Sequence, residues 1–266
     1  MAAIYEAIKC EEGRCEYVKD HLMIEEALQI NVNGEPFTVI MQSPGDEKEL
    51  TRGLLYAEDI ARKSPEHYTL ELGEPNELGH VTSVNVTAKN ENLGTGYKNS
   101  RSLLSVSSCG ICGKRELGDL SVSGKKISST ARIELSQLEK MFAEMRDKQG
   151  VFTLTGGSHA AALFSKSGQL LAVKEDVGRH NAVDKVVGSV LMNNNLTEAH
   201  YLLVSGRLSY EIVTKAFVAK TPVLAAVSAP SSLAVDYAKE FGVTLFGFCR
   251  DGRATCYANP QNLPNE

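Results

Sequence analysis

The sequence predicts an α/β protein of two parts, a small β-rich α+β domain and a larger C-terminal domain whose mixed sheet is covered by helices on both faces. The N-terminal part carries short stretches of alternating apolar and polar residues around one helical pattern. From about Ser136, continuous apolar strands alternate with amphipathic helices. A chain of 266 residues is long enough for both parts. We place the domains at residues 1–108 and 131–266, with a flexible cysteine loop and linker at 109–130.

Several segments of the N-terminal part have the pattern of half-buried strands. Residues 27–33 alternate apolar and polar side chains, and Asn33-Gly34 is a hairpin turn signal. Residues 37–41 are the expected return strand. Residues 68–72 and 81–86 alternate in the same way, so we expect a small sheet here.

One helix is expected between these strands. Ser43-Pro44-Gly45 ends the return strand, and Asp46 followed by Glu49 forms an N-cap pattern. The apolar face of this helix is formed by Leu50, Leu54 and Leu55. Residues up to about Asp20 are polar and mixed, and we predict no regular element for them.

The C-terminal part begins with a helix and a hairpin. Ser136 and Glu139 form a capping box, and Gly150 is expected to end that helix. Two apolar runs at 160–164 and 170–173 predict a buried hairpin. Helices and strands then alternate, with helical patterns at 183–191, 212–217 and 233–241 and apolar strands at 201–204, 223–227 and 243–248.

The predicted order α-β-β-α-β-α-β-α-β is that of the cytidine-deaminase-like fold, a three-layer sandwich with a mixed sheet. This similarity concerns the fold and licenses no activity. Deaminase chemistry needs His-x-Glu and a later Pro-Cys-x-x-Cys. The nearest candidate, His159-Ala160-Ala161, lacks the glutamate, and the CxxC of this chain precedes it. Hydrolytic zinc chemistry is therefore disfavoured.

Composition and charge exclude several classes of protein. The net charge of −5 argues against broad nucleic-acid binding. No apolar run reaches the about 18 residues that a membrane span needs, and residues 1–10 lack the pattern of a secretory signal. Six cysteines in this length do not indicate a disulfide scaffold, so we expect the cytoplasm, and we interpret Cys10 and Cys15 as inert thiols.

The loop around the CxxC motif combines the features of a reactive thiol site. Cys109 and Cys112 are separated by Gly110 and a single apolar residue, and Gly113 follows them directly. Glycines allow the segment to bend and present its sulfurs. Lys114-Arg115 comes next, and positive charge beside a thiol favours the thiolate.

Four interpretations of this loop compete. A structural zinc site needs four ligands, and the other cysteines lack the spacing of a second pair. A thioredoxin-like pair usually begins a helix, which the residues after Gly113 do not indicate. The remaining two are a glycine-rich turn with incidental thiols and a thiol that carries sulfur as a persulfide, with its neighbour assisting or resolving.

A second group of loops predicts a ligand site, because ligands of open α/β sheets bind outside the carboxyl ends of the strands. These loops are rich in glycine, hydroxyl groups and arginine. Arginine side chains bind phosphate, and so do the free backbone N–H groups at the start of a helix. The candidate binding residues are Gly156, Gly157, Ser158, His159, Asp176, Arg179, His180, Asn181, Ser205, Gly206, Arg207, Ser228, Phe248, Cys249, Arg250, Asp251, Gly252 and Arg253. Together they predict a pocket for a phosphorylated, nucleotide-like ligand, although no loop matches a P-loop.

Individual members of this set also have structural interpretations. Asn181 and Asp184 are equally compatible with a helix cap. Asp176 or Asp184 could instead accept hydrogen bonds from a guanine edge or a ribose. His159 and His180 are common as structural hydrogen-bonding groups, and Cys249 at the end of an apolar strand suits a small core residue.

Six segments carry a resemblance to a known family. They are SSCGICGK at 107–114, TGGSHAAALF at 155–164, EDVGRHNAVDKVVG at 175–188, SGRLSYEIVTKA at 205–216, SAPSSLAV at 228–235 and NVNGEPFTVIMQSPGDEKELTRGLL at 31–55. They closely resemble the formate dehydrogenase accessory sulfurtransferase family, FdhD, in the order of that family and over nearly the whole chain.

The resemblance implies a sulfur carrier. A cysteine desulfurase would load Cys109 with a persulfide, and Cys112 would assist. The sulfur would pass to the molybdenum (or tungsten) of the bis-molybdopterin guanine dinucleotide cofactor before its insertion into formate dehydrogenase. Residues 248–253 would contact that cofactor, GDP could mimic it, and the protein would be a homodimer. Two alternatives remain: a cofactor-binding chaperone with the CxxC in a structural metal site, and a nucleotide-modifying enzyme of deaminase type.

Overall fold

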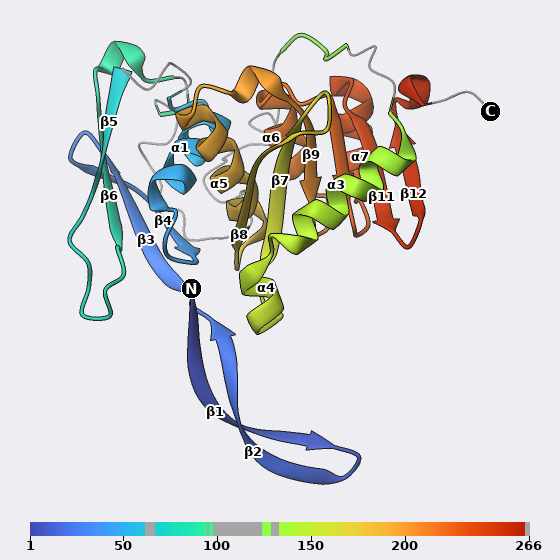
Figure 1. Ribbon diagram of the computed structural model, residues 1–266. Helices are drawn as coiled ribbons and strands as arrows, with labels where there is room; N and C mark the ends of the chain where they lie inside the picture. The colour runs from blue at the N-terminus through green and yellow to red at the C-terminus, as the bar shows by residue number, and fades with distance from the viewer. Residues whose placement is uncertain (62–66, 95, 98–123, 129–132, 264–266) are drawn as a thin grey trace.

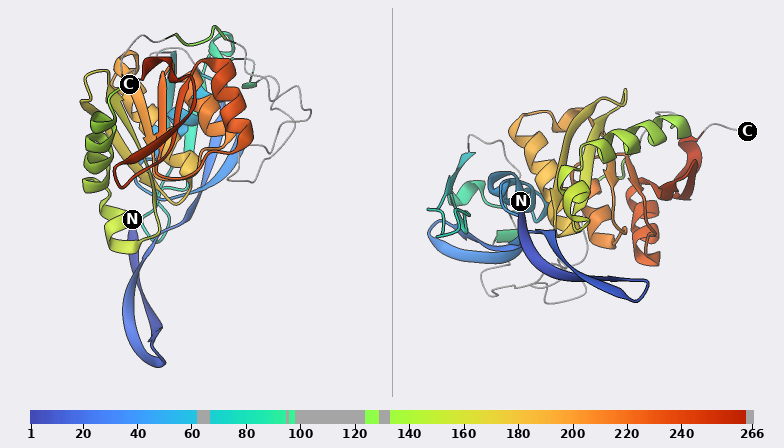
Figure 2. Two further views of the ribbon diagram at one scale, coloured as in Figure 1. Left: turned by 90° about the vertical axis from the view of Figure 1, so that its right-hand side faces the viewer. Right: turned by 60° about the horizontal axis from the view of Figure 1, so that its bottom comes forward.

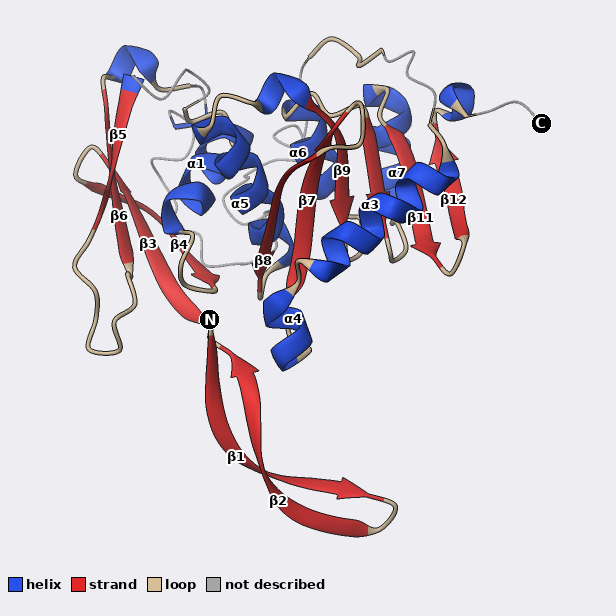
Figure 3. Ribbon diagram, viewed as in Figure 1, coloured by secondary structure: helices blue, strands red, loops and turns tan. Residues whose placement is uncertain are grey.

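The computed structural model describes residues 1–61, 67–94, 96–97, 124–128 and 133–263 (Figure 1). The predicted sulfur site, with Cys109 and Cys112, lies outside the described residues. The described strands form sheets of two, four and six strands, and the four- and six-stranded sheets both have helices packed on them (Figure 3).

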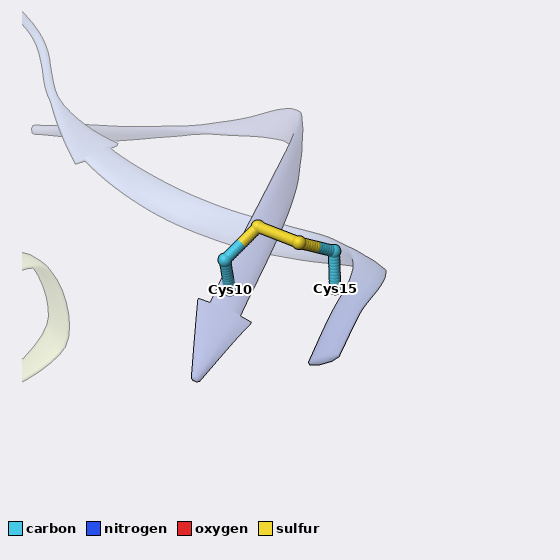
Figure 4. Close-up of a disulfide and its surroundings, with 2 residues drawn as sticks. All are labelled: Cys10 and Cys15. Atoms are coloured by element: carbon cyan, nitrogen blue, oxygen red, sulfur yellow. A yellow bond between two sulfur atoms is a disulfide. The ribbon is translucent and has the colours of Figure 1, made fainter. Parts of the chain in front are cut away.

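The first 23 residues form a long antiparallel ribbon, which was not predicted from the sequence. Strand β1 (Ala2–Glu11) pairs with β2 (Arg14–Met23), and the ribbon projects away from the rest of the molecule (Figure 1). A disulfide joins Cys10 to Cys15 near its tip (Figure 4). These two residues were interpreted from the sequence as inert rather than as a metal-ligand pair, and the disulfide between them was not predicted. Cys10 and Cys15 lie directly opposite each other because β1 and β2 pair across a short turn, and this pairing was not predicted.

The four-stranded sheet has the order β4-β3-β6-β5. Its strands are β3 (Glu26–Val32), β4 (Glu35–Gln42), β5 (Tyr68–Leu72) and β6 (Ser83–Ala88). The predicted hairpin is confirmed, because Asn33 and Gly34 have φ angles of 53° and 82° between β3 and β4. Helix α1 (Glu47–Ala57) packs its leucines Leu50 and Leu55 against one face of this sheet.

The six-stranded sheet has the order β12-β11-β10-β9-β7-β8. Its strands are β7 (His159–Ser165), β8 (Leu170–Asp176), β9 (Ala199–Val204), β10 (Val223–Ala226), β11 (Thr244–Arg250) and β12 (Arg253–Ala258). Strands β9, β10 and β11 are parallel, whereas β7, β8 and β12 pair antiparallel with their neighbours. The sheet is therefore mixed, as predicted.

Helices cover both faces of this sheet (Figure 2). They are α3 (Leu135–Asp147), α4 (Gly150–Thr155), α5 (Arg179–Met192), α6 (Tyr210–Val218) and α7 (Ser232–Phe241), with short 3-10 turns at Asn90–Asn92, Leu196–Glu198 and Pro260–Asn262. Alternate residues of β9 face opposite layers. Leu202 and Val204 pack with α5, α6 and α7, while Tyr201 and Leu203 pack with α3. None of the helices in the described part of the chain combines the length and the apolarity needed to cross a bilayer.

Helices α1 and α5 join the two sheet systems through unusually close backbone contact. A Cβ atom added to Gly53 would lie 1.9 Å from the carbonyl oxygen of Asp184. A Cβ atom added to Gly188 would lie 1.9 Å from the carbonyl oxygen of Glu49. Only glycine leaves room for this approach, so each helix supplies a glycine to the backbone of the other.

Two local predictions about helix ends were wrong, and the prediction of Asp46 as an N-cap was right in position only. Asp46 is the N-cap residue of α1, but its carboxylate bonds Lys174 on β8 and makes no cap. Helix α3 has Glu134 at its N-cap, so Ser136 lies inside the helix and forms no capping box with Glu139. Gly150 does not end that helix, because it begins α4 instead.

Strand β12 was not predicted. It follows β11 through a tight turn in which Asp251 and Gly252 have φ angles of 53° and 71°. Asp-Gly is a recognised hairpin signal, so this strand could have been predicted from the sequence. The residues that follow the turn are polar or small, and the apolar pattern used to find the other strands is absent from them.

Candidate functional site

Three of the predicted loops meet at one cleft on the edge of the six-stranded sheet. Strand β7 runs antiparallel to β9, so its beginning lies at the same edge as the ends of β9, β10 and β11. The cleft has a volume of ≈ 630 Å³, within the usual range for ligand sites. Its lining residues are Phe142, Ala143, Met145, Arg146, Gln149, Phe152, Gly156, Gly157, Ser158, His159, Ser205, Val227, Cys249 and Arg250.

The glycine segment after α4 offers open backbone to this cleft. Gly156 ends α4 in the left-handed conformation, with φ 66°, and its N–H donates to the Phe152 carbonyl at 2.7 Å. A Cβ atom added to Gly156 would meet nothing within 4 Å. Gly156 and Gly157 are both exposed, so a ligand can approach their backbone closely.

Glu175 holds this segment in place. Its carboxylate accepts hydrogen bonds from the N–H groups of Val151 and Phe152, at 2.9 and 2.8 Å, in the first turn of α4. It also accepts the hydroxyl of Ser158 at 2.5 Å. Glu175 is buried, and it joins the first turn of α4 to Ser158, the residue that follows the glycines. The sequence did not predict this role, because α4 itself was not predicted.

His159 lies among cationic groups at the cleft wall. Burial lowers the pKa of His159 from its ordinary value, and the nearby Arg179 and Arg207 lower it further, while Asp176 opposes them. The imidazole is therefore neutral near pH 7. A Cβ atom added to Gly206 would lie 3.2 Å from His159 Nδ1, so glycine allows the ring to lie against this loop.

One wall of the cleft combines aromatic rings with a guanidinium group. The Arg146 guanidinium lies over the Phe152 ring, 4.7 Å from its centroid, and both residues line the cleft with Phe142. Arginine held on an aromatic face keeps its N–H groups free at the edge of the stack. This wall can stack on a flat ring and donate hydrogen bonds to an anion.

A smaller lobe of ≈ 320 Å³ adjoins the cleft and shares Phe142, Cys249 and Arg250 with it. Its lining residues are Leu135, Leu138, Glu139, Phe142, Cys249, Arg250, Asp251, Gly252, Arg253 and Ala254. The predicted segment 248–253 therefore supplies half of the residues that line this lobe, although Phe248 does not line it. The carboxyl groups of Glu139 and Asp251 place hydrogen-bond acceptors there.

The two free cysteines near the cleft are poor nucleophiles. Burial raises the pKa of Cys249 to about 12, and burial also raises the pKa of Cys256. Both groups are protonated near neutral pH, and the thiolate is the reactive form. Cys249 packs in the core beneath the cleft, as its position at the end of an apolar strand suggested.

Asp176 lies away from both lobes and is completely buried. It forms an ion pair with Lys185 at 2.7 Å, and both side chains have no exposed surface. It also accepts the N–H groups of Ser43 and Gly178, at 3.0 and 2.7 Å, and the Asn181 amide at 2.9 Å. These bonds join the segment before α1 to α5, so the geometry gives Asp176 a structural position rather than a place among the lining residues.

Other predicted residues are held by the protein in a similar way. The Asn181 amide donates to the Met41 carbonyl at 2.7 Å, and His180 Nε2 lies 3.1 Å from the Ser209 hydroxyl. Asp184 binds the Lys215 ammonium at 2.6 and 2.9 Å. Burial raises the pKa of Asp184 to about 6, although Lys215 opposes the shift. Neither Asp176 nor Asp184 can therefore reach a guanine edge in the cleft.

The remaining predicted residues surround the cleft without lining either lobe. Arg179 and Arg207 lie close enough to His159 to lower its pKa, and Gly206 packs beside the same ring. The Ser228 carbonyl accepts the N–H of Phe248 at 3.2 Å and so joins two of the predicted loops.

Comparisons with known proteins cover nearly the whole chain. The sequence model of the FdhD/NarQ family matches residues 23–264. The Sulfolobus acidocaldarius protein named sulfur carrier protein FdhD is 38% identical over 256 residues, which cover 96% of each chain. The Streptomyces coelicolor protein of the same name is 40% identical over 263 residues, which cover 96% of this chain and 93% of the relative.

A solved structure shows the same fold. It comes from Desulfotalea psychrophila and is provisionally described as a formate dehydrogenase accessory protein. The TM-score is 0.76 at 22% sequence identity, and the match covers 99% of both chains. The family match runs through both the four-stranded and the six-stranded sheet. This chain belongs to the FdhD/NarQ family.

Proposed function

We propose that this protein carries sulfur from a cysteine desulfurase to the bis-molybdopterin guanine dinucleotide form of the molybdenum cofactor before the cofactor enters formate dehydrogenase. The observation that carries the proposal is the meeting of three distant loops at one cleft. The names of the relatives support a sulfur-carrier role. We also propose that the protein acts in the cytoplasm as a homodimer, and that its C-terminal domain is of the cytidine-deaminase-like type.

The sulfur chemistry would use the two thiols of the CxxC motif. The Cys109 thiolate attacks the outer sulfur of a desulfurase persulfide, so that a new S–S bond forms and the desulfurase thiolate leaves. Attack of the Cys112 thiolate on the sulfur of Cys109 then releases the outer sulfur as HS⁻ and leaves a Cys109–Cys112 disulfide. The two thiols thus supply the two electrons that reduce the transferred sulfur to the sulfide level, and an external thiol must reduce the disulfide afterwards.

The cleft fits a ligand that combines phosphates and a purine base. The glycine backbone at Gly156 and Gly157 can approach phosphates, and the guanidinium groups of Arg146 and Arg250 complement their charge. The aromatic wall suits a flat ring. In the smaller lobe, the carboxyl groups of Glu139 or Asp251 would accept hydrogen bonds from a guanine edge, in place of the buried Asp176 and Asp184.

The sulfur proposal is tested by intact mass after incubation with a cysteine desulfurase and cysteine. We expect one sulfur adduct on the wild type, none on Cys109→Ala, and an unchanged adduct on Cys249→Ala. Cys249 is a matched control, because it lies beside the cleft but has a raised pKa. An adduct that persists in Cys109→Ala would show that this thiol is not the carrier.

The ligand proposal is tested by calorimetric titration with GDP, which stands in for one half of the cofactor. Arg250→Gln is expected to raise the Kd by about 10- to 150-fold, the usual value of a hydrogen bond to a charged group. Lys239→Gln removes the same charge from the exposed surface of α7 and should leave the Kd unchanged. Equal affinities for the wild type and Arg250→Gln would contradict the cleft as the binding site.

A further inference from the structure

The disulfide between Cys10 and Cys15 lies near the tip of the ribbon of residues 1–23, which we call the arm (Figure 4). Both cysteines are exposed, and the arm projects from the rest of the molecule (Figure 1). The arm meets the body at its other end, where a Cβ atom added to Gly157 would lie 3.6 Å from Cβ of Met23. Another protein can therefore reach the S–S bond without contacting the cleft.

A purely structural role explains little of this disulfide. Cys10 and Cys15 are five residues apart in the sequence, and the pairing of β1 with β2 already places them opposite each other. The stabilisation that a disulfide provides grows with the length of the loop that it closes, and this loop is very short. The bond does not join the arm to either of the larger sheets. It can therefore open and close while the rest of the fold is unchanged.

The face of the arm that carries the disulfide also carries an exposed apolar pair. The next residues toward the base on this face are Ile8 and Tyr17, which lie opposite each other with 58% and 87% of their surface exposed. The pair after them on the same face, Glu6 and Lys19, is charged. The apolar surface is therefore small, and it lies directly beside the S–S bond.

We propose that Cys10 and Cys15 form a redox-active pair that exchanges with a protein dithiol, and that this partner docks on Ile8 and Tyr17. Disulfides that are exposed to solvent are the ones that take part in exchange, because a thiolate must reach one of the two sulfurs. Aromatic and apolar side chains are enriched where proteins dock. A surface of this size suits the brief contact of a redox partner, since such contacts bury less than about 1,200 Å².

The exchange proceeds in two steps. A thiolate of the partner attacks one sulfur of the Cys10–Cys15 bond, so that a mixed disulfide forms and the other arm sulfur leaves as a thiolate. The second thiolate of the partner then attacks the partner's own sulfur in the mixed disulfide and releases the second arm thiolate. Two electrons and two protons pass from the partner to the arm, and the partner becomes a disulfide. This inference does not depend on sulfur transfer.

The test compares two reductants of the oxidised full chain, thioredoxin as the protein dithiol and dithiothreitol as the small one. Free thiols at Cys10 and Cys15 are alkylated at intervals and measured by peptide mass spectrometry, so the other cysteines do not interfere. The double variant Ile8→Ser, Tyr17→Ser should lower the ratio of the thioredoxin rate to the dithiothreitol rate by at least about 10-fold, because only thioredoxin uses a docking surface.

The matched control is the double variant Ala7→Ser, Val18→Ser, which changes the neighbouring pair on the other face of the arm. Its ratio of rates should equal that of the wild type. The proposal would be overturned by an unchanged ratio in the Ile8, Tyr17 variant. A wild-type arm that thioredoxin reduces no faster than dithiothreitol does at equal concentration would overturn it as well.

A second measurement remains valid if the serine variants distort the arm. Thioredoxin that lacks its second cysteine cannot complete the exchange, so it should remain joined to the wild-type chain through Cys10 or Cys15. Adducts that form only through other cysteines would refute the proposal. Sulfur loading of Cys10→Ser, Cys15→Ser is measured separately and should equal that of the wild type, so failure of the exchange site and failure of the sulfur-carrier proposal give different results.

Discussion

The substitution Asp176→Asn separates a structural role of this residue from the ligand role that its sequence position predicts. The carboxylate accepts four hydrogen bonds, two on each oxygen, from Ser43, Lys185, Gly178 and Asn181. Asparagine is nearly isosteric, but it offers one oxygen and one NH₂ group. Two of the four donors would then face another donor, and the charge opposite Lys185 would be lost.

The expected cost follows from the burial of the pair. Lys185 has no exposed surface, and its ammonium also donates to the Ser43 carbonyl at 2.6 Å. Leaving one member of a buried ion pair unmatched costs about 3–5 kcal/mol of the free energy of unfolding. Since single domains are stable by about 5–15 kcal/mol, the variant should remain folded at low temperature but unfold at much lower urea concentration.

The assay is urea unfolding followed by far-ultraviolet circular dichroism, because the chain has no tryptophan to report by fluorescence. Asp46→Asn is the matched control. It breaks the partly exposed pair with Lys174, which keeps Glu49 at 3.6 Å, and it should cost at most about 1 kcal/mol. The double variant Asp176→Asn, Lys185→Met removes both charges and should recover part of the loss, because uncharged replacements of buried pairs are often close to neutral.

GDP titration of the folded Asp176→Asn protein completes the experiment. The Kd should equal that of the wild type, since Asp176 lies outside both lobes of the cleft. A stability loss below about 1 kcal/mol, the value of an exposed pair, would refute the reasoning from burial. A weakened Kd without any stability loss would instead restore the ligand role predicted from the sequence.

Three further predictions test other parts of the structure. Gly188→Ala should lower the free energy of unfolding by about 1–3 kcal/mol in urea titrations, because the overpacking against Glu49 exceeds the gain in helix propensity. The control Gly150→Ala adds a Cβ that meets nothing within 4 Å and should cause no loss, and equal stabilities of the two variants would contradict the close contact between the helices. The pKa of ligand-free His159 is lowered, and a bound phosphate anion favours its protonated form. The ratio of the GDP affinity of the wild type to that of His159→Gln should therefore rise as the pH falls below 6.5, because titration of GDP itself affects both proteins equally; a constant ratio would exclude a contact between this imidazole and the anion. Burial raises the pKa of Cys249 to about 12, so this thiol should react with iodoacetamide at pH 8 far more slowly than a free model thiol. Peptide mass spectrometry measures the labelling, and rapid labelling would show that the thiol is accessible and ionised.

Much of the fold could be predicted from local patterns. Alternation at 27–33 and 37–41 with an Asn-Gly turn is sufficient to identify the β3–β4 hairpin, because the turn demands positive φ angles that few residue pairs tolerate. The apolar strands of the six-stranded sheet are buried on both faces, and this burial is what makes them visible as continuous apolar runs. The strands that were missed, β1, β2 and β12, have at least one face in solvent and lack such a run.

The cleft could be predicted as a set of loops but not residue by residue. The rule that ligands bind at the carboxyl ends of strands predicted that Gly156, His159, Ser205 and Arg250 lie at the same edge of the sheet, and all four line the cleft. The wall formed by Arg146 and its aromatic neighbours was missed, because these residues lie on helices and resemble an ordinary amphipathic pattern. Only the packing of α3 across the sheet places them beside the loops.

The positions of Glu175 and Asp176 show which part of the site a single sequence does not determine. Asp176 was predicted to lie at the cleft, but Glu175 contacts the glycine segment there instead. The two residues end β8, so their side chains point to opposite faces of the sheet. Glu175 is paired with Ala160, which packs in the layer of α3, and its carboxylate therefore reaches α4 and Ser158 at the cleft. Asp176 faces the layer of α5 and meets Lys185. Alternation predicts that one of two adjacent carboxylates faces the cleft, but which one is decided by the register between β7 and β8, and that register depends on contacts between residues distant in sequence.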